Sequence, residues 1–122
     1  MSKIYEQHQT AFQKVSAFVI AKNGECVATI AFKFPKDGAS RLWAYVHWHG
    51  VPMVRGYANG YGYDKRSAAC ASASRAIEKL HKDQFLNKCE DQVAFIHALG
   101  LDDGHGWDDN LRRAGFTVWQ AV

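Results

Sequence analysis

A glycine-rich turn followed by two cations is the first feature of this chain that could do chemistry. The turn at 60–64 reads GYGYD, and Lys65 and Arg66 follow it at the start of an alanine-rich segment. Free backbone N–H groups, the positive end of a helix dipole and two side-chain cations would meet there, which suits a phosphate or carboxylate. We expect Tyr61, Tyr63, Lys65 and Arg66 to contact a partner or a phosphate. The alternative is a tight strand-to-helix turn whose cations are simply solvated.

A second candidate site is a strand at 41–49, in which two sets of residues alternate. One set, which should face the core, is Leu42, Ala44, Val46 and Trp48. The other set, which should face away from it, is Arg41, Trp43, Tyr45, His47 and His49. A row of rings and cations on one sheet face can stack nucleobases or grip a protein. The alternative is that helices from the C-terminal half cover this face and make the rings part of the core.

Metal and nucleophile chemistry find less support. His47 and His49 lie two apart on a strand, which can place two imidazoles on one metal. A third ligand would have to come from His81, His97, His105 or a cysteine, and no C-x-x-C or H-E-x-x-H pattern supports such a site. Cys70 and Cys89 lack a recognisable base motif, no G-x-S-x-G occurs, and the turn at 60–64 is no Walker loop. We therefore predict no metal, no cofactor and no enzymatic activity. A small hydrolase or nuclease using His and Asp is an alternative.

The segment 102–109 holds four aspartates in eight residues. Such a cluster can bind a cation or imitate the phosphates of a nucleic acid, although it lacks the spaced pattern of an EF-hand loop. The favoured interpretation is a helix start, because Asp108 and Asp109 suit the first turn of the helix that carries Leu111.

Composition describes a folded and mildly basic protein. The 122 residues are 48% hydrophobic and 13% aromatic, with a net charge of +3, which permits an anionic partner without requiring one. Three cysteines, Cys26, Cys70 and Cys89, are odd in number and fit a reducing cytosol better than a disulfide framework. No signal peptide and no apolar run of membrane-spanning length occur. We expect a cytoplasmic protein with no membrane partner.

Hydrophobic periodicity and turn residues predict the order of the elements. They are a short helix at 3–13, strands at 15–21, 26–34 and 41–49, a strand or strand continuation at 53–58, helices at 64–81, 92–99 and 107–114, and a closing strand at 116–122. An Asn-Gly turn at 22–25 marks the first hairpin, and Pro35 and Pro52 fall in connections. The order (α)βββ(β)αααβ predicts one α+β domain, residues 1–122, with an antiparallel sheet of three to five strands and helices packed on one face.

Particular residues should define these elements. Asp64 should cap the helix at 64–81, and Gly100 and Gly115 should end the next two helices. In the strand at 26–34 one set of residues, Cys26, Ala28, Ile30, Phe32 and Phe34, alternates with Val27, Thr29, Ala31 and Lys33. Cys70 should be a small buried residue. The packing stripe of the helix at 64–81, whose alanines imply a close approach to the sheet, is Ala69, Ala73, Ala76, Ile77 and Leu80.

Residues 1–82 resemble the double-stranded RNA-binding domain. Three antiparallel strands are followed by a glycine-rich turn, the basic pair Lys65 and Arg66, and an alanine-rich helix. The resemblance implies that this pair bridges the major-groove phosphates of a duplex. The family's third lysine has no counterpart, Asp64 adds a negative charge beside the pair, and residues 83–122 lie outside the resemblance.

The whole chain resembles small accessory proteins of temperate phages and other mobile elements. The likeness rests on the hairpin, the GYDK turn, the alanine-rich helix and the closing segment 106–118. Proteins of this kind often inhibit bacterial immunity, as anti-CRISPR proteins do, by binding an effector complex or its nucleic acid. The resemblance implies a viral inhibitor of host defence that acts in the host cell cytoplasm.

The expected function is therefore a non-enzymatic phage or mobile-element protein that binds and inhibits a CRISPR-Cas-type complex. Its partner would be a protein or ribonucleoprotein effector of the host. The alternative is a double-stranded nucleic-acid-binding module that uses the basic start of the helix at 64–81. The terminal strand at 116–122 can pair within the domain or across a homodimer.

Overall fold

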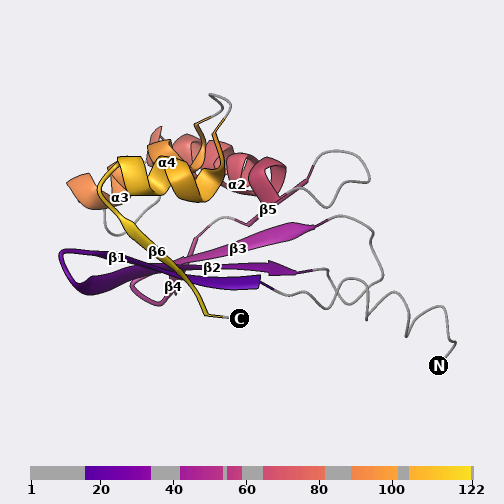
Figure 1. Ribbon diagram of the computed structural model, residues 1–122. Coiled ribbons are helices and arrows are strands. Elements are labelled where there is room, and N and C mark those ends of the chain that lie inside the picture. Colours follow the sequence, from indigo (N-terminus) through magenta and orange to yellow (C-terminus); the bar gives the residue numbers. More distant parts are fainter. Residues whose placement is uncertain are drawn as a thin grey trace, which may run out of the picture.

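The described helices lie together on one face of an antiparallel β-sheet (Figure 1). The computed structural model describes residues 16–33, 42–53, 55–58, 65–81, 89–101 and 105–121. The helix expected at 3–13 and the turn at 60–64, with its cap Asp64, lie outside these residues. Within them, the order of elements confirms the expected α+β fold, in which strands precede helices and a last strand returns to the sheet.

The sheet has six strands within the described residues, in the order β4-β3-β2-β1-β6, with β5 also paired to β3. The elements are β1 (Ser16–Lys22), β2 (Glu25–Lys33), β3 (Trp43–Trp48), β4 (Val51–Pro52), β5 (Gly56–Tyr57), α2 (Lys65–His81), α3 (Glu90–Leu99), α4 (Trp107–Arg113) and β6 (Thr117–Gln120). The sheet exceeds the expected three to five strands because the segment after β3 forms two short strands, both antiparallel to β3. Pro52, expected in a connection, lies in β4 at the sheet edge, where a missing N–H is tolerated.

The hairpin of β1 and β2 turns at Asn23 and Gly24 as expected. Their φ angles of 53° and 79° are both positive, which is the type I′ geometry that matches the twist of the strands. The register shifts beside Ile20, so that Val27 is an extra residue in β2. Strict alternation is therefore wrong at the start of the strand: Val27 is buried beside Ala28, and Cys26 is exposed.

Helix α2 packs against the sheet through small side chains, as its alanines predicted. The buried residues of this helix are Ala68, Ala69, Ser72, Ala73 and Ala76. A Cβ built on Gly56 of β5 would lie 2.1 Å from the backbone nitrogen of Ser72. Helix and strand backbones thus approach too closely for any side chain at this position. Cys70, expected to be buried, is only partly so.

The two C-terminal helices end at the expected glycines for different reasons. Gly115 has φ of 97°, and the N–H groups of Gly115 and Phe116 donate to the carbonyls of Arg112 and Leu111, which is a Schellman motif. Gly100 has φ of −88°, so its conformation suits any residue. Glycine is favoured at this position by packing, because a Cβ on residue 100 would lie 2.9 Å from the Cβ of Ala73. β6 then pairs antiparallel with β1 of the same chain.

The contact at Gly56 generates a stability prediction. Gly56→Ala should lower the free energy of unfolding by about 1–3 kcal/mol, because the new methyl group must displace the backbone of α2. Urea unfolding followed by circular dichroism measures the effect.

Matched substitutions at Gly24 and Gly56 distinguish this steric clash from backbone strain. Gly24 has open space around it but a positive φ, so Gly24→Asn should cost less than Gly24→Ala. At Gly56 the order should reverse, with Gly56→Asn costlier than Gly56→Ala. The same order at both sites would contradict the steric explanation.

Candidate binding face of the sheet

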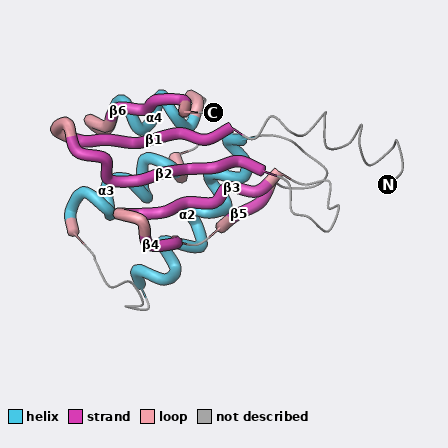
Figure 2. Tube along the Cα trace, turned by 90° about the horizontal axis from the view of Figure 1, so that it is seen from below, coloured by secondary structure: helices cyan, strands magenta, loops and turns pink. Residues whose placement is uncertain are grey.

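The face of the sheet opposite the helices carries one alternate set of β3 residues. Figure 2, which views the molecule from below, shows the strands in front of the described helices. Trp43, Tyr45 and His47 are half-buried on this outer face, whereas Ala44 and Val46 are buried on the other. The alternating pattern therefore predicted both faces of β3 correctly. The alternative, in which the C-terminal helices cover the rings, is wrong because those helices pack on the opposite face.

Aromatic and basic side chains form one cluster on and beside this outer face. We name it the aromatic–cation patch; its members are Lys33, Trp43, Tyr45, Arg55, Tyr57 and Arg75. The Lys33 Nζ lies 4.5 Å from the centroid of the Tyr45 ring. The Arg55 guanidinium lies 5.3 Å from the centroid of Trp43, whose ring is in turn 6.5 Å from that of Tyr45. Cations at these distances are attracted to the faces of the rings.

The second half of the patch depends on how β5 and α2 meet. Trp43 and Tyr57 are paired across β3 and β5, and their ring centroids are 4.9 Å apart. Arg75 of α2 lies with its guanidinium 5.2 Å from the Tyr57 ring and donates from Nη1 to the Arg55 carbonyl at 3.2 Å. The patch therefore extends from the outer face around the sheet edge onto α2.

The polar edge of the Trp43 ring is not accessible to solvent. Its Nε1 atom is shielded from solvent and has no hydrogen-bond partner among the described residues, although the residue is only half-buried. The side-chain surface that remains exposed is therefore ring carbon, which suits stacking better than hydrogen bonding.

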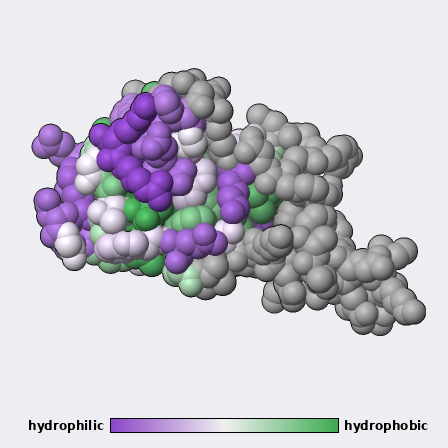
Figure 3. Space-filling view, in the orientation of Figure 1, coloured by the Kyte–Doolittle hydropathy of each residue, from purple (hydrophilic) through white to green (hydrophobic). Residues whose placement is uncertain are grey.

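Carboxylates of the described side chains come from elements other than those that build the patch rings. They are Glu25, Glu90, Asp91, Asp108 and Asp109. Asp91 pairs with Lys22 at 2.8 Å, at the hairpin end of β1. Hydrophilic residues gather over the helical layer, and hydrophobic ones show between that layer and the sheet (Figure 3). The described patch residues are thus basic and aromatic without an acidic member.

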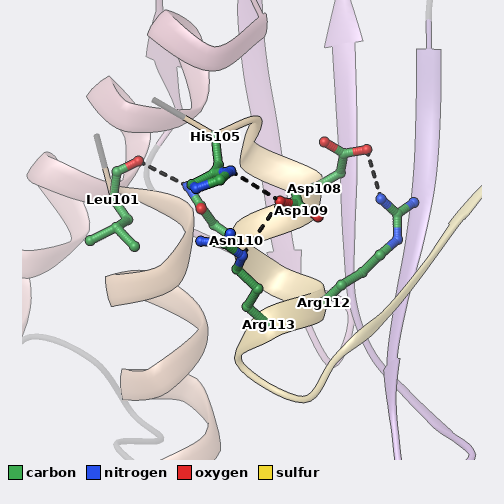
Figure 4. A network of polar contacts seen from close by, with 7 residues as sticks. All are labelled: Leu101, His105, Asp108, Asp109, Asn110, Arg112 and Arg113. Carbon is green, nitrogen blue, oxygen red and sulfur yellow. Dashed lines mark hydrogen bonds and ion pairs between the residues drawn. The ribbon is translucent and has the colours of Figure 1, made fainter. Parts of the chain in front are cut away.

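Two of the four aspartates of the acidic segment, Asp108 and Asp109, lie in the first turn of α4, in agreement with the favoured interpretation, and residues 102–104 lie outside the described part of the chain. Asp108 accepts from Arg112 Nη1 at 2.9 Å, and Asp109 lies 3.5 Å from Arg113 Nε and 3.4 Å from His105 Nδ1 (Figure 4). Both aspartates occupy the first turn of the helix, where negative charge interacts favourably with the positive end of the helix dipole. Their neighbours along the helix are cations, so the described part of the segment is poorly suited to imitate phosphates.

The start of α2 places its first cation over the core rather than at an open tip. Lys65 Nζ lies 5.6 Å from the ring centroid of Phe18 and 5.9 Å from that of Phe32. Arg66 belongs to the same helix, but its side chain lies outside the described part. Three further candidate contact residues, Arg41, Tyr61 and Tyr63, also lie outside it.

The two histidines of the 41–49 segment lie in different parts of the structure. His47 remains on the outer face of β3, whereas His49 has φ of 49° and lies in the turn to β4, exposed to solvent. Within the described residues no three His, Cys, Asp or Glu side chains converge as a metal site would require.

Four members of the aromatic–cation patch were not predicted from the sequence; they are Lys33, Arg55, Tyr57 and Arg75.

Comparison of the chain with family models, curated proteins and solved structures gave no match. The candidate site is therefore argued from its own geometry. Among the described helices, none combines the length and apolarity that a membrane crossing requires.

The sign of the electrostatic potential around the Trp43 ring can be measured by fluorescence quenching. Trp48 and Trp107 are buried, whereas Trp43 is half-buried and Trp119 is 54% exposed, so soluble quenchers should reach only the latter two. In Trp119→Phe protein, iodide should quench Trp43 more efficiently than caesium does, because Arg55 attracts the anion. The ratio of the two Stern–Volmer constants is the readout.

The reciprocal variant Trp43→Phe serves as the control, because it leaves Trp119 as the accessible indole. Its iodide-to-caesium ratio should be lower than that of Trp119→Phe protein. Equal ratios in the two variants would contradict a local positive potential at the patch.

Proposed function

We propose that this chain is a non-enzymatic binding protein whose aromatic–cation patch holds single-stranded nucleic acid. One observation carries the proposal: three aromatic rings, of which the central one neighbours both others, each have a cation within 5.3 Å of their centroid. The rings are Trp43, Tyr45 and Tyr57, and none is fully buried. Rings of this kind stack unpaired bases, and the neighbouring cations attract the phosphates.

Single strands fit this geometry better than duplexes. Bases in a duplex are stacked on one another, so an aromatic sheet face cannot reach their planes, whereas unpaired bases can lie flat on it. Duplex recognition, the alternative drawn from the sequence, relies on phosphate contacts at the start of α2. Lys65 is positioned over Phe18 and Phe32 instead, which weakens the support for that mode.

Inhibition of a host defence complex, the role expected from the resemblance to phage accessory proteins, stays a prediction. A ribonucleoprotein effector displays single-stranded RNA or a displaced DNA strand when it engages a target. A protein that binds unpaired strands could act on such a complex through its nucleic acid. Co-purification with candidate effectors, before and after nuclease treatment, tests this role separately.

Substitution of the rings tests the proposed function directly. Trp43→Leu and Tyr45→Leu should each weaken binding of labelled oligothymidylate by about 1–3 kcal/mol, roughly 5- to 150-fold, since each removes one stacking platform. Fluorescence anisotropy gives the dissociation constants. Trp43→Phe should restore most of the affinity that Trp43→Leu loses.

Trp119→Leu is the matched control, because Trp119 is an exposed ring on the same outer face. The cross-strand pairs that run from β6 to β3 place it in line with His47 and three strands away, about 14 Å, and the patch residues of β3 lie further along that strand. Its affinity should stay within about twofold of the wild type. Equal losses for Trp43→Leu and Trp119→Leu, or tighter binding of duplex than of single strand, would sink the proposal.

The cations generate a separate salt-dependence prediction. Arg55→Gln should reduce the slope of log affinity against log salt by about 0.7, the contribution of one phosphate contact on a single strand. Arg113→Gln, on α4, is the charge-matched control and should leave the slope unchanged. An unchanged slope for Arg55→Gln would show that its guanidinium does not meet a phosphate.

A further inference from the structure

An open hollow of about 530 Å³ lies where β2 meets the turn after β3. Its volume falls within the range of small-ligand sites, roughly 300–1,000 Å³. The residues that line it are Cys26, Val27, Ala28, Thr29, His47, His49 and Gly50, without a carboxylate among them. The hollow shares His47 with the outer set of β3, so it continues the surface that carries the patch.

Two backbone irregularities shape this hollow. Val27 is the extra residue of the β2 bulge, and His49 and Gly50 form a two-residue turn in which both φ angles are positive. The His49 N–H donates to the Val27 carbonyl at 2.8 Å, which ties the turn to the bulge. A Cβ at Gly50 would meet nothing within 4 Å, so the rim is open on that side. The hollow is thus framed by hydrogen-bonded backbone.

The side chains that lead to the hollow are evenly spaced. Trp43, Tyr45 and His47 occupy alternate positions of β3, about 6.8 Å apart along the strand. We propose that the hollow receives the nucleobase that follows those stacked on Trp43 and Tyr45. The proposal rests on the proposed function, because it assigns the next position on the same single strand.

The lining chemistry suits a base. The imidazoles of His47 and His49 and the hydroxyl of Thr29 can each donate or accept hydrogen bonds, as the edges of bases require. The Cys26 thiol, which lines the hollow and lies 3.8 Å from the Ala28 carbonyl that it can donate to, is exposed and serves as a reporter.

Protection of Cys26 from alkylation tests the occupancy of the hollow. The full chain is treated with N-ethylmaleimide with and without a thymidine hexanucleotide, and each cysteine is followed by mass spectrometry of its peptide. At a hexanucleotide concentration of about ten times the dissociation constant, Cys26 alkylation should slow about tenfold, because only the unliganded fraction reacts. Cys89, exposed at the start of α3, is the internal control and should react at an unchanged rate.

Variants link the protection to the hollow. His47→Ala should lower both the affinity and the protection of Cys26, and Thr29→Val, which keeps the shape of the side chain, should do so to a smaller extent. Thr29 is exposed, so Thr29→Val keeps the test valid if His47→Ala fails to fold.

The outcomes separate the two proposals. Binding that depends on Trp43 but leaves Cys26 alkylation unchanged would overturn the hollow as a base site and leave the proposed function standing. Equal slowing at Cys26 and Cys89 would also overturn it. Absence of any Trp43-dependent binding would overturn the proposed function, and the base site with it.

Discussion

The close approach of α2 to β5 is the constraint on which both faces of the sheet depend. Gly56 leaves no room for a side chain against the backbone of Ser72, so the helix lies directly on the strand. Because β5 pairs with β3, this contact fixes the sheet edge and holds Tyr57 against Trp43. It also brings Arg75, one helical turn after Ser72, over the Tyr57 ring. Core packing and patch geometry therefore have a common origin.

β3 divides its residues between two kinds of surface. One alternate set is buried under the helices, where Trp48 packs its ring 5.4 Å from that of Phe95 and contributes to the core. The other set stays on the outer face, which the described helices do not cover. Isolated exposed apolar residues are ordinary on protein surfaces, but a contiguous group of rings bordered by cations is typical of a binding surface. Trp43 belongs to this outer set and lies between the rings of Tyr45 and Tyr57.

Sequence periodicity predicted the sheet, the helices on one face and the two faces of β3, because a period of two is a local property of the strand at 41–49. It could not predict Arg55 or Arg75 as patch members, since their contacts arise only when β5 and α2 pack against β3. It missed the bulge at Val27 for a similar reason: a register shift is decided by the partner strand. The hollow beside the bulge was beyond sequence reasoning for the same cause.

The pairing of β6 with β1 closes a loop of about 100 residues between Val19 and Trp119. Contacts of such long range form slowly, whereas the hairpins of β1, β2 and β3 join near neighbours and form early. β6 contributes no residue to the patch or to the hollow. Fraying of this edge strand can therefore occur as a local opening that leaves the outer face of β3 assembled. The outer face of β3, which rests on local strand pairings, can therefore form before the β1–β6 pairing and persist when that pairing opens.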